Sequence, residues 1–382
     1  MEYLHVEVDA TSSAKKNAPA CGDVWTVERT AEATTIILAD GLGSGVKAAV
    51  AAQMAVSRMI ELGHREFSIR QAFSRVVHTM HDARGTDLPY AVLSVIRLLN
   101  TGEATILVYE MPTPIYVSRN TVIPLQMRTI TLETELIGEA SLFLEPGEGI
   151  MLMSDGITQA GMGKGLRLGW TTEGVRRYLD DCRSDGLPME NIARLVHDQA
   201  RTYWKGPFGD DCTTLLARVR PGIVINIFTG PPSDKHLDGE VAGRFLQMAG
   251  MHIVCGGTSA QIVAKRLGKP IQMEPNAQSL IAPPAYRLEG IDLVTEGAVT
   301  LNQVFNIFDA DPTEYEPDTG VTQLCQALRT ADRINILIGR AANTGHADIA
   351  FRQRGIMPRT AIMPLLIDRL RAAGKLVVSE WI

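Results

Sequence analysis

Four aspartates at the ends of strand-like runs are the residues of this sequence best suited to chemistry. Asp40 follows the apolar run TTIILA and precedes a glycine-rich turn, while Asp155 follows GIMLMS and precedes Gly156. Asp23 and Asp210 stand instead just before strand-like runs, VWTVERT and CTTLLARV. Asp-Gly is also a common turn dipeptide, so a plain turn explains each instance alone at least as well. A functional site requires that the four acids meet.

Strand pairing predicts that they do meet. The runs beside Asp23 and Asp40 are separated only by a short turn, so they should pair antiparallel and bring both carboxylates to one open end. If the strand after Asp210 pairs antiparallel with the strand before Asp155, those two acids face each other in the same way. Four carboxylates would then share one rim.

Carboxylates packed closely repel one another unless a cation compensates their charge. No His or Cys cluster accompanies them, and oxygen ligands favour Mg²⁺ or Mn²⁺ over zinc. Two such ions about 4 Å apart can activate a water and neutralise the charge of an in-line phosphoryl transfer. Hydrolysis of a phosphate ester is the predicted reaction.

The elements that must position these acids indicate an α+β domain over residues 1–220. Short apolar runs separated by turn signals predict antiparallel sheets. Ser68 and Gln71 have the spacing of a capping box at the start of a helix. The predicted helices cover residues 46–63, 68–84, 172–182 and 188–204.

The motifs GDVW, ADGLGSG, MSDG and GDDCT occur in this order, with the weaker stretch MPTPIYV between the second and third. This set resembles the PPM/PP2C superfamily of metal-dependent serine/threonine phosphatases, specifically its bacterial branch of sporulation stage II protein E. The resemblance covers roughly residues 1–220. It implies an α-β-β-α sandwich of two antiparallel sheets with helices outside.

The resemblance also implies roles for single residues. Asp40 would bridge two Mn²⁺ or Mg²⁺ ions, and Asp40 and Asp155 would be the catalytic residues. Asp211 stands where many members have Asn and is assigned to the layer behind the ligands. The implied metal ligands are Asp23, Asp40, Gly41 through its carbonyl, Asp155 and Asp210.

Two departures from the wider superfamily affect the expected chemistry. Leu42 replaces the His that eukaryotic members place after Asp-Gly as a general acid, and no Arg matches their phosphate-binding one. The general acid and the direct phosphate contacts therefore stay unassigned. The attacking group implied by the resemblance is a metal-activated water, without a covalent enzyme intermediate.

The expected substrate is the phosphoserine or phosphothreonine of a regulatory phosphoprotein, such as an anti-anti-sigma-like partner, in the bacterial cytoplasm. The resemblance also implies activation by a partner or homodimer contact that reorders helices within residues 41–85. The competing hypothesis is an inactive signalling or scaffold module that binds a phosphoprotein or a small ligand. The presence of all four acids favours the enzyme.

Cys212 and Arg218 have the C-x₅-R spacing of cysteine-dependent phosphatases, which use a thiolate nucleophile. The intervening TTLLA is strand-like, however, and a strand points alternate side chains apart rather than forming a phosphate cradle. Cys212 is therefore predicted to be a core residue.

Residues 221–382 are predicted to form a second domain, an α/β Rossmann-like fold with a mostly parallel sheet, because apolar strands alternate with helical patterns. Ligands of such sheets bind at the carboxyl ends of the strands. The best candidate for holding a small ligand is Gly256, Gly257, Thr258 and Ser259, although these residues also suit a tight turn. The four candidate loops are residues 229–233, 255–260, 295–297 and 339–345.

Composition limits the remaining classes of partner, cross-link and cellular location. The 382 residues are 45% hydrophobic and 21% charged, with a net charge of −6, so nucleic acid is not an expected partner. Five scattered cysteines without CxxC spacing argue against a disulfide framework. The sequence shows no signal peptide and no apolar run long enough to span a membrane, which predicts a cytoplasmic protein.

Overall fold

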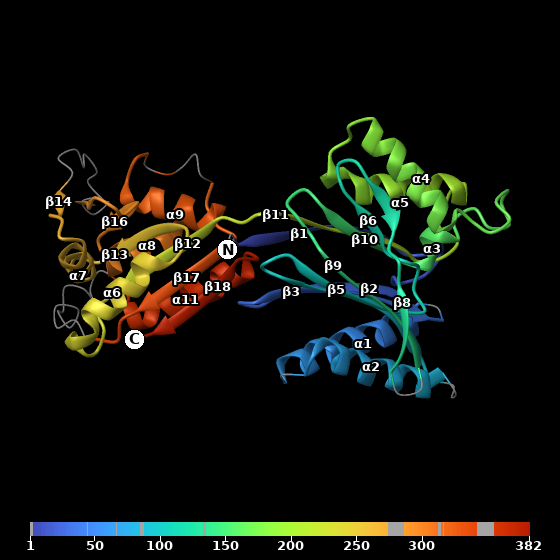
Figure 1. Cartoon of the computed structure of the whole chain (residues 1–382), viewed down its shortest axis with the longest axis horizontal. Helices are drawn as coiled ribbons and strands as arrows, with labels where there is room; N and C mark the ends of the chain where they lie inside the picture. The colour runs from blue at the N-terminus through green and yellow to red at the C-terminus, as the bar shows by residue number, and fades with distance from the viewer. Residues whose placement is uncertain are drawn as a thin grey trace. The chain divides into compact units, whose positions relative to one another are not determined.

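The computed structural model describes residues 3–43, 45–65, 67–84, 88–132, 135–273, 286–311, 315, 317–341 and 355–382. The chain divides into two compact units, Tyr3–Pro221 and Gly222–Ile382, which are described separately below (Figure 1). None of the helices in the described ranges combines the length and apolarity needed to cross a membrane.

Two antiparallel sheets form the first unit. In sheet order, the six-stranded sheet contains β2 (Asp23–Arg29), β3 (Ala33–Leu42), β4 (Tyr90–Leu99), β5 (Glu103–Tyr109), β9 (Glu135–Phe143) and β8 (Arg128–Leu132). The five-stranded sheet contains β1 (Leu4–Ser13), β11 (Cys212–Pro221), β10 (Gly149–Met153), β6 (Ile115–Val117) and β7 (Val122–Pro124).

Helices cover the outer faces of these sheets, which gives the predicted α-β-β-α layers (Figure 1). The six-stranded sheet is covered by α1 (Val46–His64) and α2 (Ile69–Arg84). The five-stranded sheet is covered by α3 (Asp155–Thr158), α4 (Thr171–Ser184), the 3₁₀ turn η1 (Met189–Asn191) and α5 (Ile192–Trp204).

The predicted capping box at the start of α2 is confirmed. The Ser68 N–H donates to Gln71 Oε1 at 3.0 Å, and the Gln71 N–H donates to Ser68 Oγ at 3.3 Å. Two N–H groups that the helix itself cannot satisfy thus find partners, which fixes where α2 begins.

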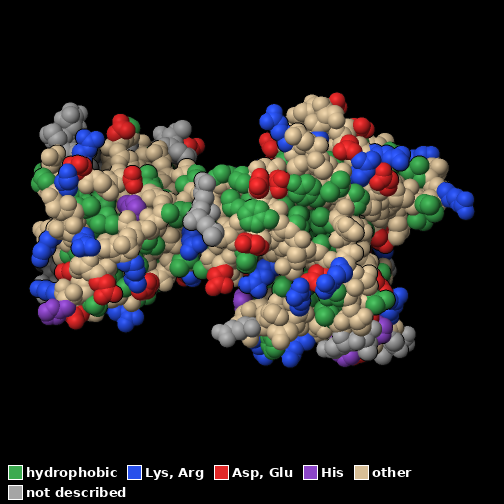
Figure 2. Space-filling view, viewed as in Figure 1, with side chains coloured by type: hydrophobic (Ala, Val, Ile, Leu, Met, Phe, Trp, Pro, Cys, Tyr) green, Lys and Arg blue, Asp and Glu red, His purple; other side chains and the backbone are tan. Residues whose placement is uncertain are grey.

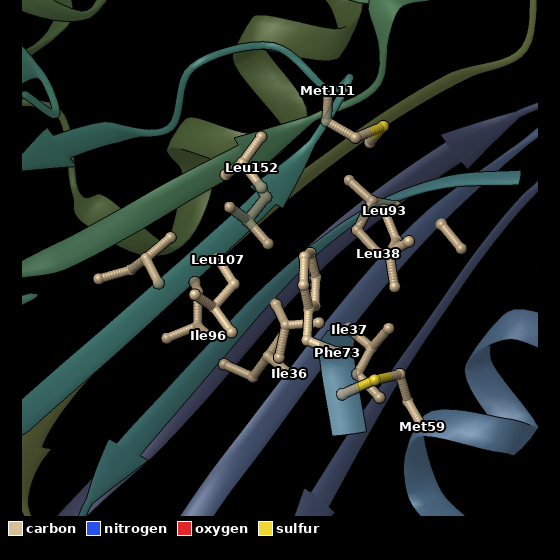
Figure 3. Close-up of a cluster of buried hydrophobic side chains, with 14 of the residues drawn as sticks. Ile36, Ile37, Leu38, Met59, Phe73, Leu93, Ile96, Leu107, Met111 and Leu152 are labelled. Atoms are coloured by element: carbon tan, nitrogen blue, oxygen red, sulfur yellow. The ribbon is translucent and has the colours of Figure 1, made fainter. Parts of the chain in front are cut away.

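One buried cluster joins the two sheets of the first unit. Leu152 of β10 lies in the same cluster as Ile96 of β4 and Leu107 of β5, and Met59 and Phe73 reach it from α1 and α2 (Figure 3). Each fully buried side chain of this size contributes about 1.5–3 kcal/mol relative to its exposed state. The shared core holds the strand ends of both sheets in a fixed relation.

The second unit contains a mixed, mostly parallel sheet. In sheet order, its strands are β14 (Gln272–Met273), β15 (Tyr286–Arg287), β16 (Leu293–Thr295), β13 (Met251–Cys255), β12 (Val224–Thr229), β17 (Arg333–Ile338) and β18 (Leu376–Trp381). The strands from β16 to β18 are parallel, as predicted, whereas β14 and β15 pair antiparallel.

Helices cover both faces of this sheet. Neighbouring residues of β12 belong to two different clusters, since Ile227 packs with α8, α9 and α11 and Phe228 packs with α6 and α7. Burial on both faces explains the continuous apolar runs of these strands. The helical elements are η2 (Lys235–Leu237), α6 (Asp238–Gln247), α7 (Gly257–Leu267), α8 (Ala298–Ile307), α9 (Gly320–Thr330) and α11 (Arg359–Ala372).

Acidic and basic side chains are interspersed on the visible face of each unit (Figure 2). This mixture is consistent with the nearly balanced numbers of acidic and basic residues, which give a net charge of −6.

Candidate functional site

The first two aspartates of the predicted site are cross-strand partners. Asp23 opens β2 and pairs with Asp40 in the antiparallel β2–β3 ladder. The strand does not end before Asp40, as the sequence indicated, because β4 extends the ladder by pairing Asp40 with Val92 and Gly41 with Ala91. Asp40 is therefore held on both sides by backbone pairing.

Asp155 and Asp210 flank the second predicted pair of strands. β10 and β11 pair antiparallel, with Met153 opposite Thr214, and α3 begins at Asp155, two positions after β10 ends. The Ser154 N–H donates to the Thr213 carbonyl at 3.0 Å, which continues the contact beyond the ladder. The predicted antiparallel pairing is confirmed.

The charges of these acids act on one another. Burial raises the pKa of Asp40 to about 9, together with the charges of Asp23, Asp155, Asp210 and Asp211. Burial also raises the pKa of Asp155, and the charge of Asp210 adds to the increase. Carboxylates from four separate segments of the chain are thus brought within electrostatic reach.

Asp23 is the most buried of the predicted carboxylate ligands, with 6% of its surface exposed. Neither of its carboxylate oxygens has a hydrogen-bond partner of ordinary geometry among the described residues. Burial raises its pKa to about 7, and the nearby hydroxyls of Ser154 and Thr213 offset that increase only in part. A buried carboxylate in this condition is poorly compensated by the chain itself.

Asp155 has a partner that fixes its orientation. Gln159, one helical turn later, donates its Nε2–H to Asp155 Oδ2 at 2.7 Å. A glutamine four residues after the acid is a spacing that sequence reasoning could have used, because residues i and i+4 lie on the same helical face.

Glycines allow the close approach of the segments that carry the acids. A Cβ on Gly41 would lie 1.9 Å from the Ala48 carbonyl oxygen of α1, and a Cβ on Gly156 would lie 2.0 Å from the Asp211 carbonyl oxygen. Each distance is far below a van der Waals contact. Glycine is therefore required at both positions by packing rather than by backbone conformation.

Lys15 is a cation at this rim that sequence reasoning missed. Its Nζ lies 3.8 Å from Asp210 Oδ1 and donates to the Gly43 carbonyl at 3.1 Å. Its backbone N–H donates to Asp211 Oδ1 at 2.9 Å. Lys15 precedes Asp211 by 196 positions, so no local pattern could have indicated the contact.

Trp204 of α5 was also missed. Its Nε1–H donates to the Gly156 carbonyl at 3.1 Å, and its ring leaves no room for a side chain at Gly209. It therefore connects the segments that carry Asp155 and Asp210 without being one of the acids itself.

The donor set fits a hard cation in its chemistry. It consists of carboxylate oxygens and the Gly41 carbonyl, without a soft ligand, and the two buried oxygens of Asp23 have no hydrogen-bond partner among the described residues. Within the part of the chain that the structure describes, no three His, Cys, Asp or Glu side chains lie closely enough together to hold a metal ion.

Cys212 does not have the properties of a nucleophile. It is the first residue of β11, fully buried, and burial raises the pKa of its thiol. A nucleophilic cysteine requires a lowered pKa and access to substrate.

The family model of stage II sporulation protein E (SpoIIE) matches residues 30–220, which is half of the chain. The chain belongs to the SpoIIE family. The match includes Asp40, Asp155 and Asp210, and Asp23 lies seven positions before it begins.

Solved structures of the SpoIIE family and of related proteins resemble the chain. The PP2C phosphatase domain of SpoIIE from Bacillus subtilis, with a fragment of its regulatory domain, is 20% identical, covers 58% of this chain and 64% of its own, and has a TM-score of 0.49. This chain thus spans less than two thirds of that structure's length. The RsbU and RsbW domains of Rv1364c from Mycobacterium tuberculosis are 16% identical, cover 64% of this chain and 68% of their own, and also have a TM-score of 0.49. The search of curated proteins gave no match.

In the second unit, residues of all four predicted ligand loops line one cavity. These include Thr229, Gly256 to Ser259, Glu296 and Ala341. Residues 342–345 of the fourth loop lie outside the described residues.

Proposed function

We propose that the first unit is a metal-dependent protein phosphatase that hydrolyses phosphoserine or phosphothreonine in a regulatory phosphoprotein. The observation that carries this proposal is the cross-strand pair of Asp23 and Asp40, in a SpoIIE-family chain, within electrostatic reach of Asp155 and Asp210.

In this proposal, Mn²⁺ or Mg²⁺ is held by Asp23, Asp40, the Gly41 carbonyl, Asp155 and Asp210. Two such ions, when bound, supply an activated water and neutralise charge at a phosphoryl group. Gln159 orients Asp155 through its hydrogen bond, and Asp211 accepts from the Lys15 N–H behind the ligands.

The proposed setting is a bacterial cytoplasm, and the proposed substrate is an anti-anti-sigma-like regulator. A partner or homodimer contact that moves α1 and α2 would act directly on the site. Gly41 packs against Ala48 of α1, so a shift of that helix changes the surroundings of Asp40.

A second candidate function is a scaffold that binds a phosphoprotein without hydrolysing it. The ammonium of Lys15 lies 3.8 Å from Asp210 Oδ1. This favours the alternative, because the ammonium compensates the charge of a carboxylate that a metal ion would need as a ligand.

Turnover and metal binding, measured together on the full chain, separate the two candidates. The substrates are p-nitrophenyl phosphate and a phosphoserine peptide with Mn²⁺, and Mn²⁺ binding is followed by calorimetry. We expect turnover that EDTA removes and that Asp155→Asn lowers by roughly 100-fold or more. Asp198→Asn, which removes an exposed charge from α5, should leave turnover unchanged.

Binding of Mn²⁺ without turnover of either substrate would favour the scaffold. If the chain neither binds Mn²⁺ nor turns over either substrate, the phosphatase proposal is wrong.

A further inference from the structure

A cavity of about 270 Å³ lies in the second unit at the carboxyl ends of its parallel strands. Residues that follow β12, β13, β16 and β17 line it, together with Arg359 at the start of α11. Open parallel sheets bind ligands at this edge, because strand ends and helix starts leave backbone groups unpaired there.

The N-terminus of α7 opens into this cavity without a cap. Gly256 precedes the helix with φ of 121°, a conformation that favours glycine, and no side chain caps the helix. The first N–H groups of a helix have no acceptor within it and carry partial positive charge. Gly257 and Thr258, which carry two of these groups, line the cavity.

The neighbouring helix α8, unlike α7, has a side-chain acceptor at its N-terminus. Glu296 accepts a hydrogen bond from the Val299 N–H at 3.1 Å, so a carboxylate of the chain already occupies the N-terminus of α8. Glu296 lines the same cavity and is the one acidic residue among its described lining residues. The positive end of α7 has no such anion among the described residues.

Ser259 provides the second, independent observation. Its side chain is fully buried and lines the cavity, yet its Oγ has no hydrogen-bond partner among the described residues. A buried hydroxyl without a partner costs free energy, which a bound acceptor would recover.

Arg359 supplies a positive charge to the same cavity. Its guanidinium packs directly over Gly230, where a Cβ would lie 2.0 Å from Cζ, and its Nη2–H donates to the Ala341 carbonyl at 2.7 Å. Its buried Nε has no partner in the described chain, and no described carboxylate forms an ion pair with it. Lys235 lines the cavity as a second cation.

We propose that this cavity binds a small phosphate ester, whose phosphoryl oxygens accept hydrogen bonds from the α7 N-terminus, Ser259 and Arg359. Phosphate suits uncapped helix N-termini and the fork of an arginine. At about 30 Å³ per water, the cavity corresponds to about nine waters, which leaves room for an organic part beside the phosphoryl group. The sequence contains neither GxGxxG nor GxxxxGK[ST], so the site is distinct from those nucleotide motifs.

Calorimetric titration of the full chain in EDTA tests this proposal independently of the phosphatase activity, because EDTA removes divalent cations from the first unit. The probes are ribose 5-phosphate, inorganic phosphate and ribose. We expect ribose 5-phosphate to bind and ribose not to bind. Arg359→Gln should weaken binding by about tenfold or more, because it removes a charge-assisted hydrogen-bond donor.

Thr258→Glu is a second test variant, which should abolish binding without unfolding the chain. The new carboxylate would take the place of the ligand at the α7 N-terminus, so we expect binding to be lost while the midpoint of thermal unfolding stays equal or rises. Lys265→Gln removes an exposed charge at the other end of α7 and should change the affinity less than about twofold.

Tighter binding of ribose 5-phosphate than of phosphate would support an ester as the ligand, and binding of phosphate alone would reassign the site to the free ion. If neither probe binds, or if Arg359→Gln and Thr258→Glu both bind as the unaltered chain does, the proposal is wrong.

Discussion

Asp23 and Asp40 lie directly opposite each other in the β2–β3 ladder. Like charges at such positions destabilise a sheet, and burial increases the cost because water no longer screens them. Burial is the main cause of the raised pKa of both carboxyl groups, and the charge of Asp23 raises the pKa of Asp40 further. A bound cation would offset it, which is why the pair suits a metal site better than a purely structural role.

Neutralising one member of the pair should stabilise the metal-free chain. Near pH 8, Asp40 must take up a proton when the metal-free chain folds, because its folded pKa is about 9, and Asp40→Asn avoids that cost. In EDTA we therefore expect the midpoint of thermal unfolding to rise by about 2–4 °C for each kcal/mol gained. Asp198→Asn, an exposed change on α5, should shift the midpoint by less than about 2 °C. A clear loss of stability in Asp40→Asn would contradict the account of this pair.

The stability of the metal-free chain should fall as pH rises. A carboxyl group with a raised folded pKa keeps its proton after the unfolded chain has lost it, so its contribution is complete below about pH 4. That contribution is lost as pH rises through the folded pKa, about 7 for Asp23 and about 9 for Asp40. Urea unfolding in EDTA from about pH 5 to 9 measures this decline.

The decline in the free energy of unfolding should be shallower in Asp40→Asn, which lacks one of the titrating groups. A free energy that is constant or increases over this range in the unaltered chain would be inconsistent with the raised pKa values.

Gly41→Ala should destabilise the first unit. The added Cβ would lie 1.9 Å from the Ala48 carbonyl oxygen, so α1 or β3 must shift. Overpacking of this kind costs about 1–3 kcal/mol, which urea unfolding can measure. Gly63→Ala, in the last turn of α1, has no atom within 4 Å of its new Cβ and should be neutral or stabilising. Equal effects of the two substitutions would show that the close contact at Gly41 is not as described.

Lys15→Gln should tighten the binding of Mn²⁺. The Lys15 ammonium near Asp210 opposes a divalent cation at that carboxylate, and partly exposed pairs are worth up to about 1 kcal/mol. We therefore expect up to about fivefold higher affinity by calorimetry. Lys16→Gln removes the adjacent, exposed charge and serves as the matched control. Weaker Mn²⁺ binding in Lys15→Gln alone would mean that Lys15 supports the site instead.

The parts of this structure that local sequence determines were predictable. The short turn before Ala33 implied the hairpin that joins β2 to β3, and the spacing of Ser68 and Gln71 implied the start of α2. Both depend on residues close in sequence, so period and turn chemistry are sufficient.

The parts that depend on distant residues were not predictable. The first half of β9, beginning at Glu135, buries two acids, Glu135 and Glu139, on the same face as Ile137, and only its pairing with β5 and β8 makes it a strand. Lys15 and Trp204 reach the site through contacts 196 and 48 positions apart in the chain. Their roles follow from packing, which no local pattern records.

The central claim is that Asp23, Asp40, Asp155 and Asp210 share hard cations at one rim. Anomalous diffraction at the manganese edge, from crystals of the full chain soaked in Mn²⁺, tests it most directly. We predict anomalous peaks within coordinating distance of Asp40 and of the other three carboxylates. Manganese bound only elsewhere, with Lys15 still beside Asp210 and no peak at Asp40, would contradict the account.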